Sequence, residues 1–115
     1  LQLIKGWVDA QGRMRNEVVP IAGDALGKAS SVDLETGKRV GTGHGSLCAV
    51  YRDQTFDPKL HAYYYLRVVE TPSVRWSFHD CRRLPEAERP AVCTDGSYPA
   101  IIREMAWTSP VWYRP

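Results

Sequence analysis

Residues 61–70 show the clearest alternation of side chains in the chain. One set comprises Ala62, Tyr64, Leu66 and Val68, and the other comprises Tyr63, Tyr65 and Arg67. Because successive side chains of a strand point to opposite faces, this pattern predicts a strand with one apolar face and one aromatic face. We expect another part of a larger protein to cover the aromatic face, with a carbohydrate-stacking surface as the alternative.

The remaining pattern predicts further short strands joined by turns. Residues 1–8 and 14–21 are expected to form a hairpin closed at Gly12. Further strands are expected at residues 31–34, 47–52, 74–78 and 100–113, and one helical turn is expected at residues 85–89. Pro110 places the last strand at an edge or a bulge, because proline cannot donate to a ladder.

Two long segments between these strands predict loops. Residues 22–45 contain six glycines, Gly23, Gly27, Gly37, Gly41, Gly43 and Gly45. Residues 82–99 are rich in proline and charge. The pattern as a whole predicts an all-β fold, an antiparallel β-sandwich with long Gly/Pro-rich loops. An immunoglobulin-like topology is one arrangement that it allows.

The length of 115 residues predicts a single β-rich domain, residues 1–115, that buries about two-thirds of its unfolded surface. Both ends are strand-like, so we interpret the chain as the C-terminal fragment of a larger protein. The net charge of +2 is too small for the basic surface of a typical nucleic-acid-binding domain. No apolar run approaches the roughly 20 residues of a membrane span, so neither nucleic acid nor membrane is an expected partner.

Three cysteines are present, Cys48, Cys81 and Cys93. In an oxidising compartment, the simplest pairing is Cys81 with Cys93, which closes a short loop and contributes about 3 kcal/mol by the chain-entropy estimate. Cys48 lies in an apolar strand pattern and is expected to be a buried, inert thiol. His79 with Cys81 and Cys93 matches no standard zinc spacing, so no metal site is expected.

No set of catalytic residues is apparent. The glycines of residues 41–45 lack the Lys-Ser or Lys-Thr pair of a phosphate-binding loop. A Cys48 nucleophile with His44 as its base would need a third group to orient the base. The serines lack a Gly-x-Ser-x-Gly setting. The chain alone is therefore expected not to be catalytic.

Five strings in order resemble the C-terminal end of the Domain of Unknown Function 3604 family. They are IKGWVD (4–9), LCAVYRD (47–53) with FDP (56–58), YYLRV (64–68), PSVRWS (72–77) and AWTSPVWY (106–113). The match spans nearly the whole chain. Proteins of this family resemble exported bacterial hydrolases whose N-terminal body is similar to metal-dependent phosphoesterases of the polymerase-and-histidinol-phosphatase type.

The resemblance implies a function for the chain as part of such a protein. It would be a non-catalytic C-terminal β-domain that supports or closes the active-site body of a periplasmic or secreted hydrolase. The divalent metal and its ligands would belong to that N-terminal body, the expected partner, and no ligand carries over to this sequence. Exposed apolar surface also predicts a homo-oligomer. The alternative is an independent carbohydrate- or peptide-binding β-sandwich module.

The resemblance also singles out residues that would pack against, or reach into, the pocket of the larger protein. They are Arg75, Trp76, Arg103, Glu104 and Trp107. Arginine suits phosphate or sulfate oxygens because its planar fork binds them in pairs. The simpler interpretation pairs an arginine with Glu70 or Glu104 on a strand surface. A protein partner predicts a flat patch of Tyr63, Tyr65 and Trp112, whereas a small ligand predicts a concave groove.

Overall fold

The computed structural model describes residues 1–24 and 30–115, and the chain divides into two compact units. Unit 1 comprises Leu1–Ala25, His44–Val69 and Met105–Pro115, and unit 2 comprises Leu26–Gly43 and Glu70–Glu104. The strands of both units pair antiparallel, and the described residues as a whole are β-rich as expected. Gly27, predicted to lie in a loop, is outside the described residues.

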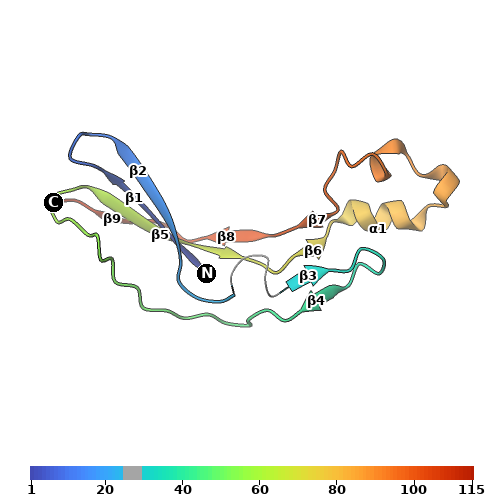
Figure 1. The fold of residues 1–115 in the computed structure, drawn as a ribbon, viewed down its shortest axis with the longest axis horizontal. Coiled ribbons are helices and arrows are strands. Elements are labelled where there is room, and N and C mark those ends of the chain that lie inside the picture. Colours follow the sequence, from blue (N-terminus) through green and yellow to red (C-terminus); the bar gives the residue numbers. More distant parts are fainter. Residues whose placement is uncertain (25–29) are drawn as a thin grey trace. The chain divides into compact units, whose positions relative to one another are not determined.

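Unit 1 is built on one five-stranded antiparallel sheet (Figure 1). Its strands are β1 (Gln2–Val8), β2 (Met14–Pro20), β5 (Ala62–Val69), β8 (Met105–Trp107) and β9 (Val111–Tyr113). The order is β2-β1-β5-β8, and β9 pairs with β5 beside β8. All described strands of unit 1 belong to this sheet, so the sandwich and its immunoglobulin-like form stay predictions.

The predicted β1–β2 hairpin is confirmed. Gly12 has φ +77°, the left-handed conformation that glycine adopts without steric cost. Asp9 stabilises the turn, because its Oδ1 accepts the backbone N–H groups of Gln11 and Arg13 at 3.0 and 2.9 Å. The same carboxylate pairs with the side chains of Arg13 and Arg15. The turn therefore fixes the register in which β2 meets β1.

The predicted alternation of β5 is also confirmed by its register with β1. Lys5 lies opposite Tyr64 and Gly6 lies opposite Tyr63, so the two pairs occupy opposite faces of the sheet. The ring of Tyr63 occupies the space that a Cβ at Gly6 would need. A glycine at this position therefore lets the tyrosine ring lie against β1.

Unit 2 contains two short two-stranded antiparallel sheets and the α-helix of the described residues. Its elements are β3 (Ser30–Val32), β4 (Arg39–Gly41), β6 (Ser73–Val74), α1 (Trp76–Arg83), the 3₁₀ turns η1 (Glu86–Glu88) and η2 (Ala91–Cys93), and β7 (Ile101–Ile102). β3 pairs with β4, and β6 pairs with β7. A Cβ at Gly37, in the β3–β4 turn, would lie 3.0 Å from the Phe78 ring, so α1 packs against this turn. A disulfide joins Cys81 of α1 to Cys93 of η2.

Three strand predictions were wrong in detail. Residues 47–52 form no strand, because no described strand pairs with them and none of their side chains is buried; Val50 is fully exposed and Cys48 is an exposed free thiol instead of a buried one. Residues 74–78 are a strand only at Val74, and from Trp76 they belong to α1, which packs against other residues of unit 2. Residues 100–113 form three short strands, interrupted before Met105 and again around Pro110. The helical turn predicted at residues 85–89 is confirmed as η1.

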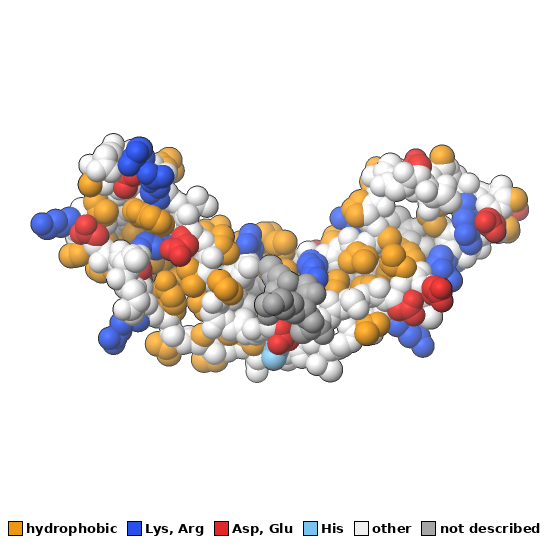
Figure 2. Space-filling view, in the orientation of Figure 1, with side chains coloured by type: hydrophobic (Ala, Val, Ile, Leu, Met, Phe, Trp, Pro, Cys, Tyr) orange, Lys and Arg blue, Asp and Glu red, His pale blue; other side chains and the backbone are white. Residues whose placement is uncertain are grey.

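Few side chains are buried for a chain of this size. In unit 1 the buried apolar side chains are Leu3, Ile4 and Ala62. Large apolar side chains remain open to solvent in both units, among them Met14 at 83%, Trp76 at 79% and Val111 at 70% exposure. Figure 2 shows hydrophobic side chains, in orange, spread over the visible surface. Within the described residues, no helix has the length and apolar character needed to cross a membrane.

We predict that Gly6→Ala destabilises the protein by about 1–3 kcal/mol, because the new methyl group overlaps the Tyr63 ring. Urea unfolding followed by circular dichroism measures the change. Gly45→Ala is the matched control, since a Cβ there meets no atom within 4 Å, and it should change stability by less than about 0.5 kcal/mol. Equal effects of the two substitutions would contradict the role given to Gly6.

Candidate functional site

An open hollow lined by aromatic side chains lies on one face of the five-stranded sheet. Its volume is about 330 Å³, and its lining residues are Tyr63, Tyr65, Trp107, Thr108, Pro110 and Trp112. All of them belong to unit 1. β5 supplies the two tyrosines, β8 and β9 supply one tryptophan each, and the link between β8 and β9 supplies the other two residues.

The interruption between β8 and β9 places the two tryptophans at the ends of the hollow. Thr108 stays paired with β5, because its N–H donates to the Leu66 carbonyl at 3.1 Å and its Oγ1 accepts the Leu66 N–H at 3.0 Å. Pro110 has no N–H to donate, and pairing resumes at Val111. The predicted edge position of Pro110 is confirmed, since β8 and β9 pair only with β5 among the described strands.

Register explains why the four aromatic side chains share a face. Trp107 lies opposite Arg67 and Trp112 lies opposite Tyr63. Residues 63, 65 and 67 of β5 point to the same side, because side chains of a strand alternate with period two. Tyr63, Tyr65 and Trp112, which the protein-partner hypothesis placed in one patch, therefore lie on one face together with Trp107.

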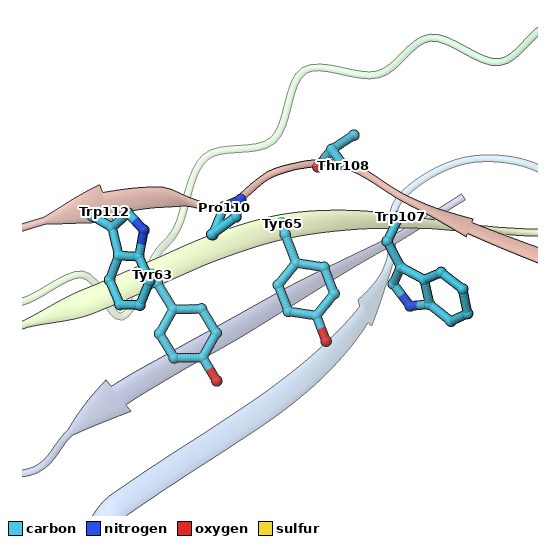
Figure 3. Close-up of a pocket in the computed structure, with 6 residues that line it drawn as sticks. All are labelled: Tyr63, Tyr65, Trp107, Thr108, Pro110 and Trp112. Atoms are coloured by element: carbon cyan, nitrogen blue, oxygen red, sulfur yellow. The ribbon is translucent and has the colours of Figure 1, made fainter.

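The two tyrosine rings form a shelf. Their centroids are 6.3 Å apart and their planes differ by 10°. Figure 3 shows the rings side by side along β5, with both hydroxyl groups pointing the same way. Trp112 lies at one end, with its ring centroid 5.2 Å from that of Tyr63 and its plane tilted by 50°, and Trp107 lies at the other end beyond Tyr65.

The shelf carries polar atoms without partners in the protein. The hydroxyls of Tyr63 and Tyr65 form no hydrogen bond with another described residue, and neither do the indole N–H groups of Trp107 and Trp112. By contrast, the Tyr113 hydroxyl donates to the Pro58 carbonyl at 3.0 Å. The free polar groups stay in contact with solvent and are available to a ligand.

The hollow is also more exposed than ordinary aromatic packing would leave it. Trp107 is 60% exposed and Trp112 is 63% exposed. Single exposed apolar residues are common on protein surfaces, whereas a contiguous exposed aromatic patch marks an interaction site.

The opposite face of the sheet carries a buried ion pair that sequence reasoning missed. Lys5 Nζ lies 2.6 Å from Asp53 Oδ2, and the Tyr64 hydroxyl donates to the same oxygen at 2.7 Å. Lys5 also donates to Thr55 Oγ1 at 2.9 Å. The side chains of Lys5 and Asp53 are only 4% and 10% exposed. The signal in the sequence was that Lys5 shares a strand face with the apolar Leu3. A lysine buried on such a face needs a partner for its charge.

The ion pair fixes residues 53–60 on that face and perturbs both acidic groups. Desolvation raises the pKa of Asp53, but the hydrogen bonds from Lys5, Tyr64 and Thr55 outweigh it and hold the pKa well below its usual range. Burial, followed by the hydrogen bond to Asp53 and the repulsion of its charge, raises the pKa of Tyr64 far above its usual value. Phe56 packs edge-on against Tyr113 in the same segment, with ring centroids 4.8 Å apart.

Of the residues singled out by the family resemblance, only Trp107 belongs to the hollow; Arg75, Trp76, Arg103 and Glu104 lie in unit 2. Arg75 precedes α1, and its N–H donates to the Ala100 carbonyl at 2.9 Å. Its Nε is buried and has no hydrogen-bond partner. The neighbouring Trp76 is 79% exposed.

The expected pairing of an arginine with Glu70 or Glu104 takes a different form. Glu70 pairs with Arg39 at 3.0 Å, and the described residues include no ion pair of Arg75 or Arg103 with either glutamate. The Glu104 carbonyl instead accepts the backbone N–H of Glu70 at 2.9 Å. Sequence reasoning could not select Arg39, because it lies 31 residues before Glu70 and no local pattern links the two.

Within residues 1–24 and 30–115, no three His, Cys, Asp or Glu side chains gather as a group that could hold a metal ion. His79 instead lies edge-on to its neighbours Trp76 and Phe78, with ring centroids 6.3 and 5.6 Å apart. His44 pairs with Asp24 at 3.0 Å.

We predict that Asp53→Asn destabilises the protein by about 3–5 kcal/mol, because it leaves the buried Lys5 charge without its partner. Because the folded pKa of Asp53 is depressed, its stabilisation is complete above the unfolded pKa of about 4 and is lost as the pH falls below that value. Urea unfolding at several pH values should therefore show a weaker acid dependence for Asp53→Asn. The control Asp57→Asn alters an exposed carboxylate that caps the Lys59 N–H, and both stability and pH dependence should stay near wild type.

The comparisons with known proteins give one family. The family model described as "Protein of unknown function (DUF3604)" matches residues 1–115, which confirms the family suggested by the five sequence strings. No curated protein and no solved structure matches the chain. The chain therefore belongs to the DUF3604 family.

Proposed function

We propose that this chain is the non-catalytic, C-terminal β-rich part of an exported metal-dependent hydrolase of the phosphoesterase type, and that it supports or closes the active-site body. The sandwich arrangement expected from the sequence is part of this proposal, with the body or a second layer covering exposed sheet surface. The divalent metal would be held by the body, and no residue of this chain is assigned as a ligand.

One observation carries the proposal: an exposed tryptophan stands beside an unsatisfied arginine at the start of α1. Trp76 is 79% exposed, although tryptophan has a large apolar ring whose burial would stabilise the protein. The adjacent Arg75 has a buried Nε without an acceptor, so its guanidinium is incompletely hydrogen-bonded within the described residues. A protein surface with an apolar pocket would cover the Trp76 ring, and a carbonyl or carboxylate oxygen of that surface would bring a partner close to the Arg75 charge.

The small core supports the same conclusion. A domain of about this size normally hides most of its large apolar side chains, whereas here Met14, Val111 and Trp76 are among many that stay exposed. Tryptophan and arginine are also the residues that most often dominate the binding energy of an interface. The surface at Arg75 and Trp76 therefore has the composition of a docking site.

We predict that bound divalent metal and hydrolysis of phosphate or sulfate esters occur in the longer protein and not in the 115-residue chain alone. Elemental analysis and turnover of chromogenic esters, measured side by side on both proteins, test this division. Metal-dependent turnover by the chain alone would contradict the non-catalytic role and direct attention to His79, Cys81 and Cys93.

We further predict that Trp76→Ala weakens binding between this chain and a separately expressed hydrolase body by about 2 kcal/mol, or roughly thirty-fold in dissociation constant. Titration calorimetry measures the affinity. Because Trp76 is exposed, the stability of the chain itself should change by less than about 0.5 kcal/mol. Tyr98→Ala is the control, since Tyr98 is a 64% exposed aromatic residue of the same unit. An equal loss with both variants would reject Trp76 as the docking residue.

A further inference from the structure

We propose that the aromatic hollow of unit 1 binds a neutral polysaccharide, with consecutive sugar rings lying along the row formed by Trp112, Tyr63, Tyr65 and Trp107. This ligand site goes beyond the accessory role proposed above. It lies on a different unit from Trp76, so either proposal can fail without the other.

The shape of the row fits a chain of pyranose rings. The planes of Tyr63 and Tyr65 differ by only 10°, and the rings lie side by side in Figure 3, so together they offer an extended flat surface. Centroid separations of 5.2 Å and 6.3 Å along the row are comparable with the spacing of successive sugars in an extended polysaccharide. The C–H groups on the face of a sugar carry partial positive charge and are attracted by the negative face of an aromatic ring.

The Gly6 position shows that the shelf is built into the sheet. Any larger side chain there would occupy the space of the Tyr63 ring. Backbone pairing of Gly6 with Tyr63, and of Tyr63 with Trp112, fixes the positions from which these rings project. A preorganised surface loses little conformational entropy when a ligand binds.

The polar atoms of the hollow favour a sugar over an apolar protein segment. The hydroxyls of Tyr63 and Tyr65 and the indole N–H groups of both tryptophans have no partner among the described residues. An apolar segment seated on the shelf would bury some of these groups without hydrogen bonds, which costs free energy. Sugar hydroxyls donate and accept, so a polysaccharide satisfies these groups while its C–H faces cover the rings.

The charge on this face favours a neutral ligand. Register places Gln2, Asn16 and Met14 on the same face in β1 and β2, and none of them is charged. Arg67, opposite Trp107, is the charged strand residue of this face within the described residues, and its Nε already donates to Gln2 Oε1 at 2.8 Å. The face therefore holds no cluster of cations that would select an acidic polysaccharide.

Affinity electrophoresis of the 115-residue chain in gels containing soluble β-glucan, xylan, galactomannan or polygalacturonate tests the proposal, and titration calorimetry gives the affinity for any polysaccharide that retards it. We expect retardation by at least one of the three neutral polysaccharides. Tyr65→Ala and Trp107→Ala should each weaken that binding about ten-fold or more. Tyr65→Phe keeps the ring and should cost less than Tyr65→Ala. Trp76→Ala and Tyr98→Ala, in unit 2, should bind as the unchanged chain does.

Two results would overturn the inference. The first is the absence of binding to all three neutral polysaccharides. Binding to polygalacturonate alone, lost when salt is added, counts as the same result, because it reflects charge and not the aromatic row. The second is binding that Trp107→Ala leaves unchanged; Trp107 is 60% exposed, so its replacement tests the hollow even if Tyr65→Ala fails to fold. If no polysaccharide binds and Trp107→Ala instead weakens binding to the hydrolase body, the hollow is a protein-docking surface and the accessory role still stands.

Discussion

Backbone hydrogen bonds on both edges of β5 hold the five-stranded sheet together. One edge pairs with β1 over six residues, and the other pairs with β8 and then with β9. Neither β8 nor β9, of three residues each, would be stable as a strand without this template. The position of every aromatic side chain in the hollow therefore depends on the register of β5.

The alternation of β5 assigns different physical tasks to the two faces of the sheet. On one face, Tyr64 completes the hydrogen bonding of Asp53, so the buried Lys5 charge is compensated and residues 53–60 are fixed. On the other face, Tyr63 and Tyr65 make no such bonds and lie open beside two tryptophans. Three consecutive tyrosines thus serve both faces of the sheet, Tyr64 one face and Tyr63 and Tyr65 the other, and a shift of register by one residue would exchange the faces.

Unit 2 achieves its order by other means. The disulfide between Cys81 and Cys93 ties α1 to the following turns, and Phe78 packs against the β3–β4 turn at Gly37. These contacts hold α1 in place while leaving Trp76 at its start exposed. Both units expose aromatic side chains. A larger protein body and a ligand, as proposed, would cover these side chains.

Local pattern in the sequence determined the β1–β2 hairpin, the two faces of β5 and the 3₁₀ turn at η1. Each of these follows from residues close in the sequence or from the period of a strand. The presence of Trp112 beside Tyr63 and Tyr65 depends instead on the pairing of β9 with β5. Tertiary structure decided the helix at Trp76–Arg83, the exposure of Cys48, the pairing of Lys5 with Asp53 and that of Arg39 with Glu70. These features depend on which distant segments meet, and no local pattern carries that information.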